Sequence, residues 1–557
     1  MLARSIIANL SGWRTNGRWM GSSAVRTLGD TTLKVAGGWE TDGVMQDGYA
    51  FQSYDVVIIG RGPVGATLAN LLGLCGVRTL VLEREARAYH LPRAVHFDDE
   101  CMRVFQAIGL AEAILPHVIV SPGMLFLDAD GRLLLDWSRP LTLTPLGWNL
   151  SYRFHQPDLE EVLIGGLQRW PHVATRNRCD VFALDQDETG VRVRYEDLSN
   201  GQLTEVRARY VIGCDGARSL VRRFIGSGMD DLGFHERWLV VDVLLKRNRD
   251  DLGDYSLQHC DPRRPATYVR GTGTRRRWEI TVLPDEDTQG VTQPTKVWEL
   301  LSRWITPEDA ELERAAVYTF HSTIAQQWRD RRLILAGDSA HQTPPFLGQG
   351  MCAGIRDAAN LAWKLSAILS GHADARLLDT YQSERQPHVR EFVELAIRLG
   401  GLINTKAVEA GLAAGQAREN APVKLEVKKP LLGPGLALSD LPMAGHLAPQ
   451  FTLHDGRRSD DAIGYAYVLL TESAGAIPRP LQRAFGDNGV SMLTGDAAAG
   501  VGTWLRDNGL RAALVRPDRY VIGAASNDGE LDRLAATAVI LPIHVPSRPE
   551  HIPEDIP

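Results

Sequence analysis

Residues 54–83, YDVVIIGRGPVGATLANLLGLCGVRTLVLE, decide the fold. The run Asp55–Ile59 is short, apolar and rich in β-branched residues, which predicts a strand covered on both faces. Three glycines follow in G-x-G-x-x-G spacing, and helix-forming residues then continue to Leu74. A second apolar run, 79–82, predicts another buried strand that ends at Glu83. The stretch therefore predicts a strand, a glycine turn, a helix, a strand and an acid in that order.

The three glycines of this turn, Gly60, Gly62 and Gly65, have different expected roles. The first allows a sharp turn, the second lets the backbone approach a pyrophosphate, and the third lets the helix pack against the strand. The helix N-terminus offers free N–H groups and partial positive charge to the phosphates. Glu83 lies where an acid accepts hydrogen bonds from an adenosine ribose. The stretch predicts dinucleotide binding, with FAD and NAD as the alternatives.

The composition narrows the class of protein. A chain of 557 residues is too long for one ordinary core, so we expect two or three domains. An apolar fraction of 44% and a charged fraction of 23% are typical of a soluble globular protein. The net charge of −7 has no long block of like charge, which argues against a nucleic-acid partner. No apolar run approaches the roughly 18 residues of a membrane helix, so we expect no membrane partner.

The cysteines are scattered along the sequence, at Cys75, Cys101, Cys179, Cys214, Cys260 and Cys352. Their spacing contains no C-x-x-C and no cluster typical of a metal site. We therefore expect reduced thiols in a cytoplasmic protein, no metal, and no close cysteine pair that could form a redox-active disulfide.

The first 52 residues differ from the rest of the chain. Up to Asp30 they contain no acid, whereas Arg4, Arg14, Arg18 and Arg26 are present with serines between them. This composition resembles that of an organelle transit peptide, and a disordered extension is the alternative. In either case we expect this segment to lie outside the fold.

Three further positions have both a binding and a structural interpretation. Arg93 precedes an expected helix over 98–110 and either contacts a cofactor or lies on the surface. Gln156 stands just outside a helix expected to begin at Pro157, and either bonds a cofactor or caps that helix. Asp215 follows a strand and precedes a helix, so it either reaches a cofactor hydroxyl or serves as an N-cap.

A second glycine-rich loop follows the expected strand over 332–336. Gly337–Asp338 comes first, and Pro344–Gly350 then leads into a helix expected over 352–369. Backbone N–H groups of such a loop can face the ring carbonyl of a flavin and stabilise negative charge there. His341, between the two glycine-rich parts, is a candidate proton relay, with a structural histidine as the alternative.

Three motifs, at Gly60, at Asp215–Gly216 and at Gly337–Asp338, stand in one order along the chain. Together they resemble the single-component flavoprotein aromatic hydroxylases of the para-hydroxybenzoate hydroxylase-like class. Finer stretches are similar to the 3-(3-hydroxyphenyl)propionate hydroxylase branch, and the likeness covers about residues 53–545. These stretches are Pro92–Ala94, Asp98–Glu100, Gly348–Gly350, Arg356–Leu365 and Val515–Arg519.

The resemblance implies an α/β fold with a Rossmann-like FAD-binding domain, an interleaved β-sheet substrate domain and a C-terminal thioredoxin-like domain. The FAD-binding domain is expected in three parts, 53–120, 151–227 and 326–420, and the substrate domain in two, 121–150 and 228–325. A linker over 421–444, the thioredoxin-like domain over 445–545 and a tail over 546–557 follow. The thioredoxin-like domain contains no cysteine, so a structural or homodimer role is expected in place of a redox role.

The resemblance also assigns cofactor-binding residues by position. The glycine turn and Glu83 would bind the ADP half of FAD, Arg93 and Gln156 its middle, and Asp338 the ribityl chain, while Gly348–Gly350 would face the isoalloxazine. Cys352 replaces an asparagine of many relatives, which matters only if that side chain contacts the flavin. The expected set is Gly60, Gly62, Pro63, Val64, Gly65, Glu83, Arg84, Arg93, Gln156, Asp215, Gly337, Asp338, Pro345, Gly348, Gln349, Gly350, Met351 and Cys352.

The implied activity is an NAD(P)H-dependent flavoprotein monooxygenase that hydroxylates a phenolic acid ortho to its hydroxyl through a flavin C4a-hydroperoxide. The expected substrate is 3-(3-hydroxyphenyl)propanoate or 3-hydroxycinnamate, with O₂ as the second substrate and aromatic catabolism as the setting. No catalytic residue is assigned beyond the candidates His341 and Pro345. Alternatives are a hydroxylase of another phenol, polyketide or antibiotic, and a non-enzymatic flavin-binding regulator.

Overall fold

A computed structural model of the chain describes residues 52–87, 93–403, 423–425 and 428–541. All of these residues belong to one unit, Tyr49–Pro557. The expected N-terminal extension, apart from Gln52, and the expected tail over 546–557 lie outside the described residues. None of the described helices combines the length and the apolar character that crossing a bilayer requires.

Residues 54–83, with the glycine turn, form the centre of an eight-stranded sheet. β1 (Ser53–Ile59) pairs in parallel with β2 (Thr79–Leu82) on one side and with β11 (Gln202–Gly213) on the other. Val56, Val57 and Ile58 are fully buried, as expected for a strand covered on both faces. The sheet order is β17-β18-β11-β1-β2-β8, with an antiparallel extension of β11 by β10 and then β9. The remaining strands are β8 (Val173–Arg176), β9 (Cys179–Gln186), β10 (Val191–Asp197), β17 (Arg329–Asp330) and β18 (Leu333–Leu335).

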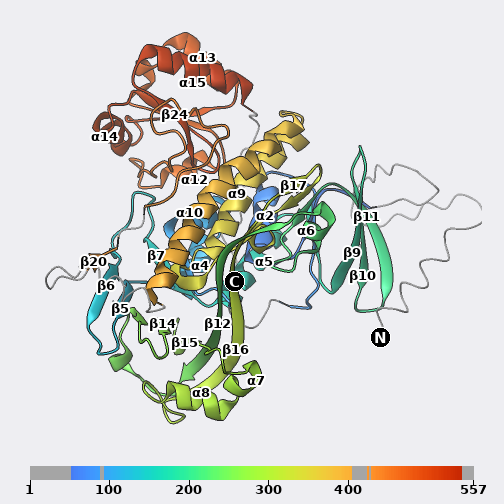
Figure 1. Ribbon diagram of the computed structural model, residues 1–557. Helices are drawn as coiled ribbons and strands as arrows, with labels where there is room; N and C mark the ends of the chain where they lie inside the picture. The colour runs from blue at the N-terminus through green and yellow to red at the C-terminus, as the bar shows by residue number, and fades with distance from the viewer. Residues whose placement is uncertain (1–51, 88–92, 404–422, 426–427, 542–557) are drawn as a thin grey trace, which may run out of the picture. The chain divides into compact units, whose positions relative to one another are not determined.

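Helices cover this sheet. α2 (Pro63–Leu74) follows the glycine turn and packs against the long buried helix α9 (Gly350–Leu369), which begins two residues before the expected Cys352. Figure 1 shows α9 beside α2 and α10 (Asp379–Ile403). Other elements of this region are α3 (Asp99–Ala107), α4 (Ala111–Ile114), η2 (Leu115–His117), α5 (Gln156–Gly165), η3 (Gly166–Arg169), α6 (Leu220–Ile225), η5 (Gly337–Ser339), η6 (Pro345–Leu347) and η7 (Ala375–Leu378).

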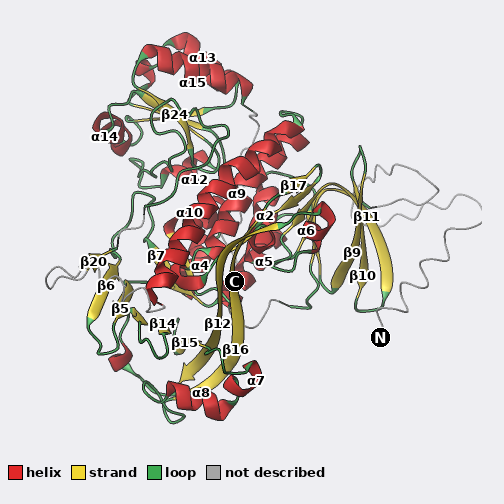
Figure 2. Ribbon diagram, viewed as in Figure 1, coloured by secondary structure: helices red, strands yellow, loops and turns green. Residues whose placement is uncertain are grey.

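A nine-stranded sheet forms the second layer of the fold. Two long antiparallel strands, β12 (Met229–Leu245) and β16 (Ala310–Ala325), run together along it, with α7 (Thr288–Val291) and α8 (Pro294–Leu301) at one end (Figure 2). β5 (Gly123–Leu127) and β6 (Leu133–Ser138) join this sheet from the segment expected to contribute to it. Its other elements are η4 (Asp250–Leu252), β13 (Ser256–His259), β14 (Ala266–Arg270), β15 (Arg275–Thr281), β19 (His341–Gln342) and β20 (Val423–Lys424).

A three-stranded sheet connects the two layers. β3 (His96–Asp98) pairs with β7 (Ser151–Phe154), and β7 pairs with β4 (Val118–Val120), in both cases antiparallel. α3 follows β3 directly, and the side chain of Asp98 caps it by accepting a hydrogen bond from the Cys101 N–H. This short sheet places His96 and Ser151 between the two large sheets.

The C-terminal part of the chain has its own four-stranded sheet, ordered β22-β21-β23-β24. β21 pairs in parallel with β22 and antiparallel with β23. Buried residues such as Tyr465 and Leu469 continue the same core as β1 and α9. The elements are α12 (Ser459–Ile463), β21 (Val468–Thr471), η8 (Ala474–Ala476), α13 (Arg479–Asp487), β22 (Ser491–Thr494), α14 (Ala499–Asp507), β23 (Ala512–Val515), β24 (Val521–Ala525) and α15 (Asp528–Ile540).

Candidate active site

The glycine turn has the geometry that its spacing predicts. Gly60 has a φ of +97°, and a Cβ there would lie 2.4 Å from the carbonyl oxygen of Cys214. A Cβ on Gly65 would lie 2.1 Å from the carbonyl oxygen of Gly60. A Cβ on Gly62, in contrast, would meet no atom within 4 Å. The first and third glycines therefore allow close packing, whereas the second leaves open space in front of the N-terminus of α2.

The N-terminus of a second helix, α9, faces the same space. A Cβ on Gly354 of α9 would lie 2.4 Å from the Val64 side chain of α2, which shows how closely the two helices pack. The loop before α9 turns at Gly348, where φ is +63° and a Cβ would lie 2.7 Å from Nδ1 of His96. Two helix N-termini, each with free N–H groups and partial positive charge, thus converge on one cavity.

This cavity, called here the turn cavity, has a volume of about 360 Å³. Many of the residues expected to bind a cofactor line it although they come from four separate segments of the chain. They are Gly62, Pro63, Val64, Arg93, Gln156, Asp338, Pro345, Gly348, Gly350 and Met351.

The other expected residues do not line the turn cavity: Gly60, Gly65, Glu83, Arg84, Asp215, Gly337, Gln349 and Cys352. Glu83 nevertheless supports the glycine turn, because its Oε2 accepts a 2.7 Å hydrogen bond from the Arg61 N–H. Arg84 is exposed and lies 3.5 Å from Glu85. Gly337 supports the second loop, where its N–H donates to Asp357.

Asp215 contacts the backbone of the helix that follows it. Its Oδ2 accepts hydrogen bonds from the N–H groups of Leu220 and Val221, at 2.6 and 3.2 Å. Its buried Oδ1 has no hydrogen-bond partner among the described residues, and burial raises the pKa of this carboxyl. The side chain therefore contacts the first turn of α6, but the N-cap of that helix is Ser219 and not Asp215 as the capping alternative expected. A role of Asp215 toward a cofactor stays a prediction.

Gln156 lies in the first turn of α5, not just outside it, because the helix begins one residue earlier than expected. Its Oε1 accepts hydrogen bonds from the N–H groups of both Arg93 and Ala94, each at 2.8 Å. Its Nε2 donates to Glu160 at 2.7 Å. The amide is thereby fixed in orientation and holds the Arg93 segment at the edge of the turn cavity.

Asp338 differs from these residues because its carboxylate lines the turn cavity and makes no hydrogen bond or ion pair to another described residue. Since Gly337 holds a φ of +66° immediately before it, the side chain leaves the strand end toward the cavity. A carboxylate in that position has acceptor oxygens available for a ligand hydroxyl.

The two catalytic candidates are placed differently. His341 is fully buried, and its Nε2 lies 2.6 Å from Oδ2 of Asp357, whose Oδ1 accepts from Arg385. It lines none of the three cavities described here, so its contacts are those of the structural alternative. Pro345 lines both the turn cavity and a neighbouring one.

That neighbouring cavity, called here the inner cavity, has a volume of about 80 Å³. It shares Val95, His96, Glu279, Pro345 and Gly348 with the turn cavity, so the two adjoin. Aromatic and aliphatic side chains form much of its wall, together with two arginines, Arg139 and Arg153. A mostly apolar wall with a few polar groups is typical of a small-molecule site.

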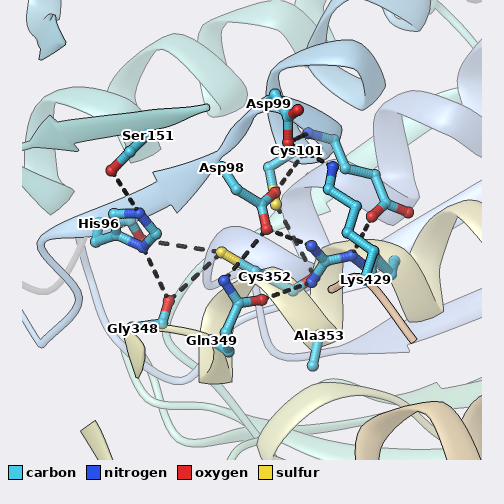
Figure 3. A network of polar contacts seen from close by, with 12 residues as sticks. His96, Asp98, Asp99, Cys101, Ser151, Gly348, Gln349, Cys352, Ala353 and Lys429 are labelled. Atoms are coloured by element: carbon cyan, nitrogen blue, oxygen red, sulfur yellow. Dashed lines mark hydrogen bonds and ion pairs between the residues drawn. The ribbon is translucent and has the colours of Figure 1, made fainter. Parts of the chain in front are cut away.

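His96, which was not predicted from the sequence, contacts both the loop before α9 and Ser151 of β7 (Figure 3). Its Nδ1 lies 3.3 Å from the Gly348 carbonyl oxygen, and its Nε2 lies 2.9 Å from Ser151 Oγ and 2.7 Å from Arg139 Nη1. Burial, assisted by the charge of Arg139, lowers the pKa of His96 to about 3. Because a guanidinium can only donate, the neutral ring carries its proton on Nδ1.

A buried network of charges fixes the loop before α9. Arg356 Nε donates to Oε2 of Glu100 at 2.6 Å, Nη1 donates to Gln349 at 2.9 Å, and Nη2 pairs with Asp98. Burial acts to raise the pKa of Asp98, but Arg356 and Lys429 outweigh it and hold that pKa below its ordinary value. Gln349 therefore points into this network (Figure 3) and orients the loop from behind.

The expectation that the chain has no close cysteine pair is wrong in three dimensions. Cys101 and Cys352 are 251 residues apart, yet their sulfur atoms and a carboxylate oxygen of Asp98 all lie within 4.8 Å of one another, because α3 packs against α9. Burial raises the pKa of Cys101 well above its ordinary value, so this thiol stays protonated. The Arg356 cation on Asp98 disfavours a metal ion in the same place.

Cys352 itself faces the interior. Its Sγ lies 3.5 Å from the Gly348 carbonyl oxygen, and its side chain is fully buried. This arrangement favours the alternative in which the cofactor contact at this position comes from the backbone, so that a cysteine is tolerated in place of an asparagine.

The residues present fit FAD. The open space at Gly62 lies where a pyrophosphate requires close backbone approach, and two helix N-termini supply positive potential for phosphate and ring oxygens. Asp338 lines the same cavity and offers an acceptor that has no partner among the described residues. A mixed α/β fold with one glycine-turn sheet and a second antiparallel layer, built around such a cavity, defines a dinucleotide-binding flavoprotein.

Comparisons with known proteins identify the family. A family model described as "FAD binding domain" matches residues 53–396. The "Probable NADH-specific resorcinol 4-hydroxylase" of Rhodococcus jostii (strain RHA1) is 41% identical over 521 residues, which is 89% of this chain and 97% of the relative. The "3-(3-hydroxy-phenyl)propionate/3-hydroxycinnamic acid hydroxylase" of Mycobacterium sp. (strain JLS) is 42% identical over 352 residues, which is 63% of this chain and 60% of the relative.

Solved structures agree on the fold. The flavin-dependent monooxygenase PieE, in complex with FAD and substrate, matches with a TM-score of 0.75 at 23% identity, over 88% of this chain and 99% of the other. The p-nitrophenol 4-monooxygenase PnpA from Pseudomonas putida DLL-E4 matches with a TM-score of 0.59 at 26% identity, over 66% and 95% of the two chains. The chain belongs to the FAD-binding-domain family and is a FAD-dependent aromatic hydroxylase.

Proposed function

We propose that this enzyme hydroxylates a phenol that carries a second substituent at the 3-position, ortho to the phenolic hydroxyl, with NADH as the electron donor. Resorcinol, 3-(3-hydroxyphenyl)propionate and 3-hydroxycinnamic acid, which appear in the names of the relatives, are all phenols of this kind. NADH specificity appears in the name of the Rhodococcus relative. One phenol, one O₂, one NADH and one proton would give the phenol with one added hydroxyl group, NAD⁺ and water.

The observation that carries the proposal is the contact between the turn cavity and the inner cavity. They meet at Pro345 and Gly348, in the loop expected to face the flavin ring. When bound, FAD supplies hydride acceptance and O₂ activation, and the protein supplies position and a dry cavity. Phe126, Trp137 and Phe346, which line the inner cavity and are buried, exclude water from the reacting ring.

Glu279 is the group best placed to accept the phenolic proton. It lies on β15, lines both cavities, and has a pKa raised by burial. A carboxyl with a raised pKa is better matched to proton transfer near neutral pH than an ordinary one. The variant Glu279→Gln should keep FAD but lower the rate of hydroxylation and change its pH profile. Glu311→Gln, an exposed change on β16, is the control.

The proposal is tested with a panel of phenols under aerobic conditions with NADH. Resorcinol, 3-(3-hydroxyphenyl)propanoate and 3-hydroxycinnamate are compared with 3-(4-hydroxyphenyl)propanoate, and product with one added hydroxyl group is scored against H₂O₂. At least one 3-substituted phenol should be converted with most of the NADH coupled to product, and the 4-substituted isomer should not. Conversion of the 4-substituted propanoate at the rate of the 3-substituted isomer, or no product from any phenol, would contradict the proposal.

Further proposals concern the C-terminal part of the chain, its domain boundaries, its oligomeric state and its location. We propose that residues 445–541 form a thioredoxin-like domain with a structural role, which is supported by its four-stranded sheet flanked by α13, α14 and α15 and by the lack of cysteine after Cys352. We likewise propose the expected domain boundaries, a homodimer and a cytoplasmic location. A substrate of polyketide or antibiotic type is the alternative that the phenol panel would leave open if it gave no product.

A further inference from the structure

Arg139 lies where two cavities meet. It follows β6 directly and lines both the inner cavity and a third cavity of about 610 Å³, called here the side cavity. The two cavities also share His96, Trp137 and Leu347. A group bound in the inner cavity can therefore extend past the Arg139 guanidinium toward the side cavity.

The described residues contact the Nη1 group and one face of this guanidinium. Nη1 donates to Nε2 of His96 at 2.7 Å and to the hydroxyl of Ser151, and the guanidinium carbon lies 4.4 Å from the ring centre of Trp137. Nε and Nη2 donate no hydrogen bond to any described residue. The contacts fix the plane of the guanidinium and leave two donor groups facing the cavities.

Arg139 is half-buried and differs from three buried arginines that pair with acids. Arg277 and Arg314 both pair with Asp242, at 2.7 and 2.6 Å, and Arg356 pairs with Glu100 at 2.6 Å. No described carboxylate lies within ion-pair distance of Arg139. Burial lowers the pKa of Arg139 to about 10, so it still carries its charge at neutral pH. A half-buried charge that has no carboxylate at ion-pair distance, and only more distant acids such as Asp98 to attract it, favours an anionic ligand group here.

We propose that Arg139 determines substrate specificity by binding an anionic oxygen at the 3-position of the phenol. This inference rests on the proposed function. A carboxylate at the end of a short side chain supplies such an anion directly. The second hydroxyl of resorcinol supplies one when its proton passes to solvent, which the neighbouring guanidinium favours, and both oxygens accept the donors that a guanidinium presents. His96 positions Arg139 relative to the loop before α9, because the same ring contacts the carbonyl of Gly348 in that loop.

The experiment compares Arg139→Gln and Arg139→Lys with the wild-type holoenzyme. Dissociation constants are measured from the change in FAD absorbance on titration with 3-(3-hydroxyphenyl)propanoate, resorcinol and 3-propylphenol, which has no oxygen at its 3-substituent. FAD content is measured for every variant. Arg132→Gln, an exposed change in the turn before β6, is the matched control and should change no constant.

Arg139→Gln should weaken binding of 3-(3-hydroxyphenyl)propanoate, of resorcinol or of both at least tenfold, and should change binding of 3-propylphenol less than threefold. It should retain FAD. Arg139→Lys should recover part of the lost affinity. Loss with the propanoate identifies a carboxylate as the anion, and loss with resorcinol alone identifies the second hydroxyl. An equal loss for all three ligands, or no loss for any, would overturn the role of Arg139. If the wild-type enzyme hydroxylates none of the three, the proposed function fails instead.

Discussion

The hydroxyl group of Tyr520 donates a 2.7 Å hydrogen bond to Oε1 of Glu100, a residue 420 positions earlier in the chain. The other oxygen of Glu100 accepts a hydrogen bond from Arg356. Arg356 in turn donates to Gln349 in the loop before α9. Three consecutive contacts therefore join the C-terminal sheet to the loop at the cofactor cavity. A C-terminal part without cysteine can in this way influence the site without redox chemistry.

We predict that Tyr520→Phe destabilises the protein by about 2 kcal/mol, because a buried carboxylate oxygen loses its hydrogen bond. FAD affinity should fall several-fold because the loop is less firmly held. The measurements are urea unfolding and FAD titration. Tyr467→Phe is the matched control, since the buried Tyr467 hydroxyl has no partner among the described residues and its removal should cost almost nothing. Equal effects of the two substitutions on stability and FAD affinity would contradict the proposed link between Tyr520 and the loop before α9.

The glycine turn predicts that folding and FAD binding can be separated. Gly62→Ala adds a methyl group to open space, so the protein should keep its thermal stability and lose FAD affinity at least tenfold. Gly65→Ala places a Cβ 2.1 Å from the Gly60 carbonyl oxygen, so it should destabilise the fold itself. Melting temperature and FAD content, measured for both variants, check this. Full FAD retention by a stable Gly62→Ala protein would show that the pyrophosphate does not lie at this turn.

The two acids at strand ends are predicted to act differently. Asp338→Ala should lower FAD retention with little change in stability, because this carboxylate lines the turn cavity and has no protein partner among the described residues. Asp215→Ala should cost about 1 kcal/mol of stability through loss of its hydrogen bonds to two N–H groups at the start of α6. Flavin absorbance of the purified variants and their unfolding midpoints are the readouts. Unchanged flavin occupancy in Asp338→Ala would remove this residue from the site.

Features of the fold and of the candidate site could be predicted from the sequence where they depend on residues that are neighbours in the chain. The glycine turn, both helix N-termini and Asp338 were predictable because each depends on neighbouring residues: a strand, a glycine and a helix in succession. Several residues that share the turn cavity were predicted from four separate segments, since each segment carries its own turn chemistry.

His96, Arg139 and Glu279 could not be predicted in the same way. β3 belongs to the three-stranded sheet, whereas β6 and β15 are separate strands of the nine-stranded sheet. The three residues meet only at the inner cavity, and no spacing in the sequence signals that contact. The pair Cys101 and Cys352 was missed for the same reason, since α3 and α9 are distant in the chain. His96 had one weak signal, its position just after the Pro92–Ala94 stretch.

The interface between α3 and the C-terminal part predicts acid sensitivity. Burial acts to raise the pKa of Asp460, but Arg103 and Arg519, at 2.6 and 3.0 Å, outweigh it and lower that pKa from 3.8 to about 2. Because the unfolded chain takes up this proton first, the stabilisation is present above about pH 4 and is lost as the pH falls toward 2. The loss amounts to about 2 kcal/mol.

Asp460→Asn should remove this part of the pH dependence and lower stability at neutral pH by about 3 kcal/mol, because two buried guanidinium groups lose their counter-charge. Urea unfolding between pH 3 and pH 7 measures both effects. Asp185→Asn, which breaks an exposed pair with Arg194, is the control and should leave the pH dependence unchanged. The same pH slope in wild type and Asp460→Asn would contradict the assignment.

The most direct test of the central claim is the fate of ¹⁸O₂. The purified enzyme is supplied with NADH, ¹⁸O₂ and a 3-substituted phenol, and the product is examined by mass spectrometry together with NADH consumption. The account predicts a yellow protein that places one ¹⁸O atom ortho to the phenolic hydroxyl for each NADH oxidised. A colourless protein that takes up no FAD, or NADH oxidation that yields H₂O₂ and no labelled product with any such phenol, would contradict it.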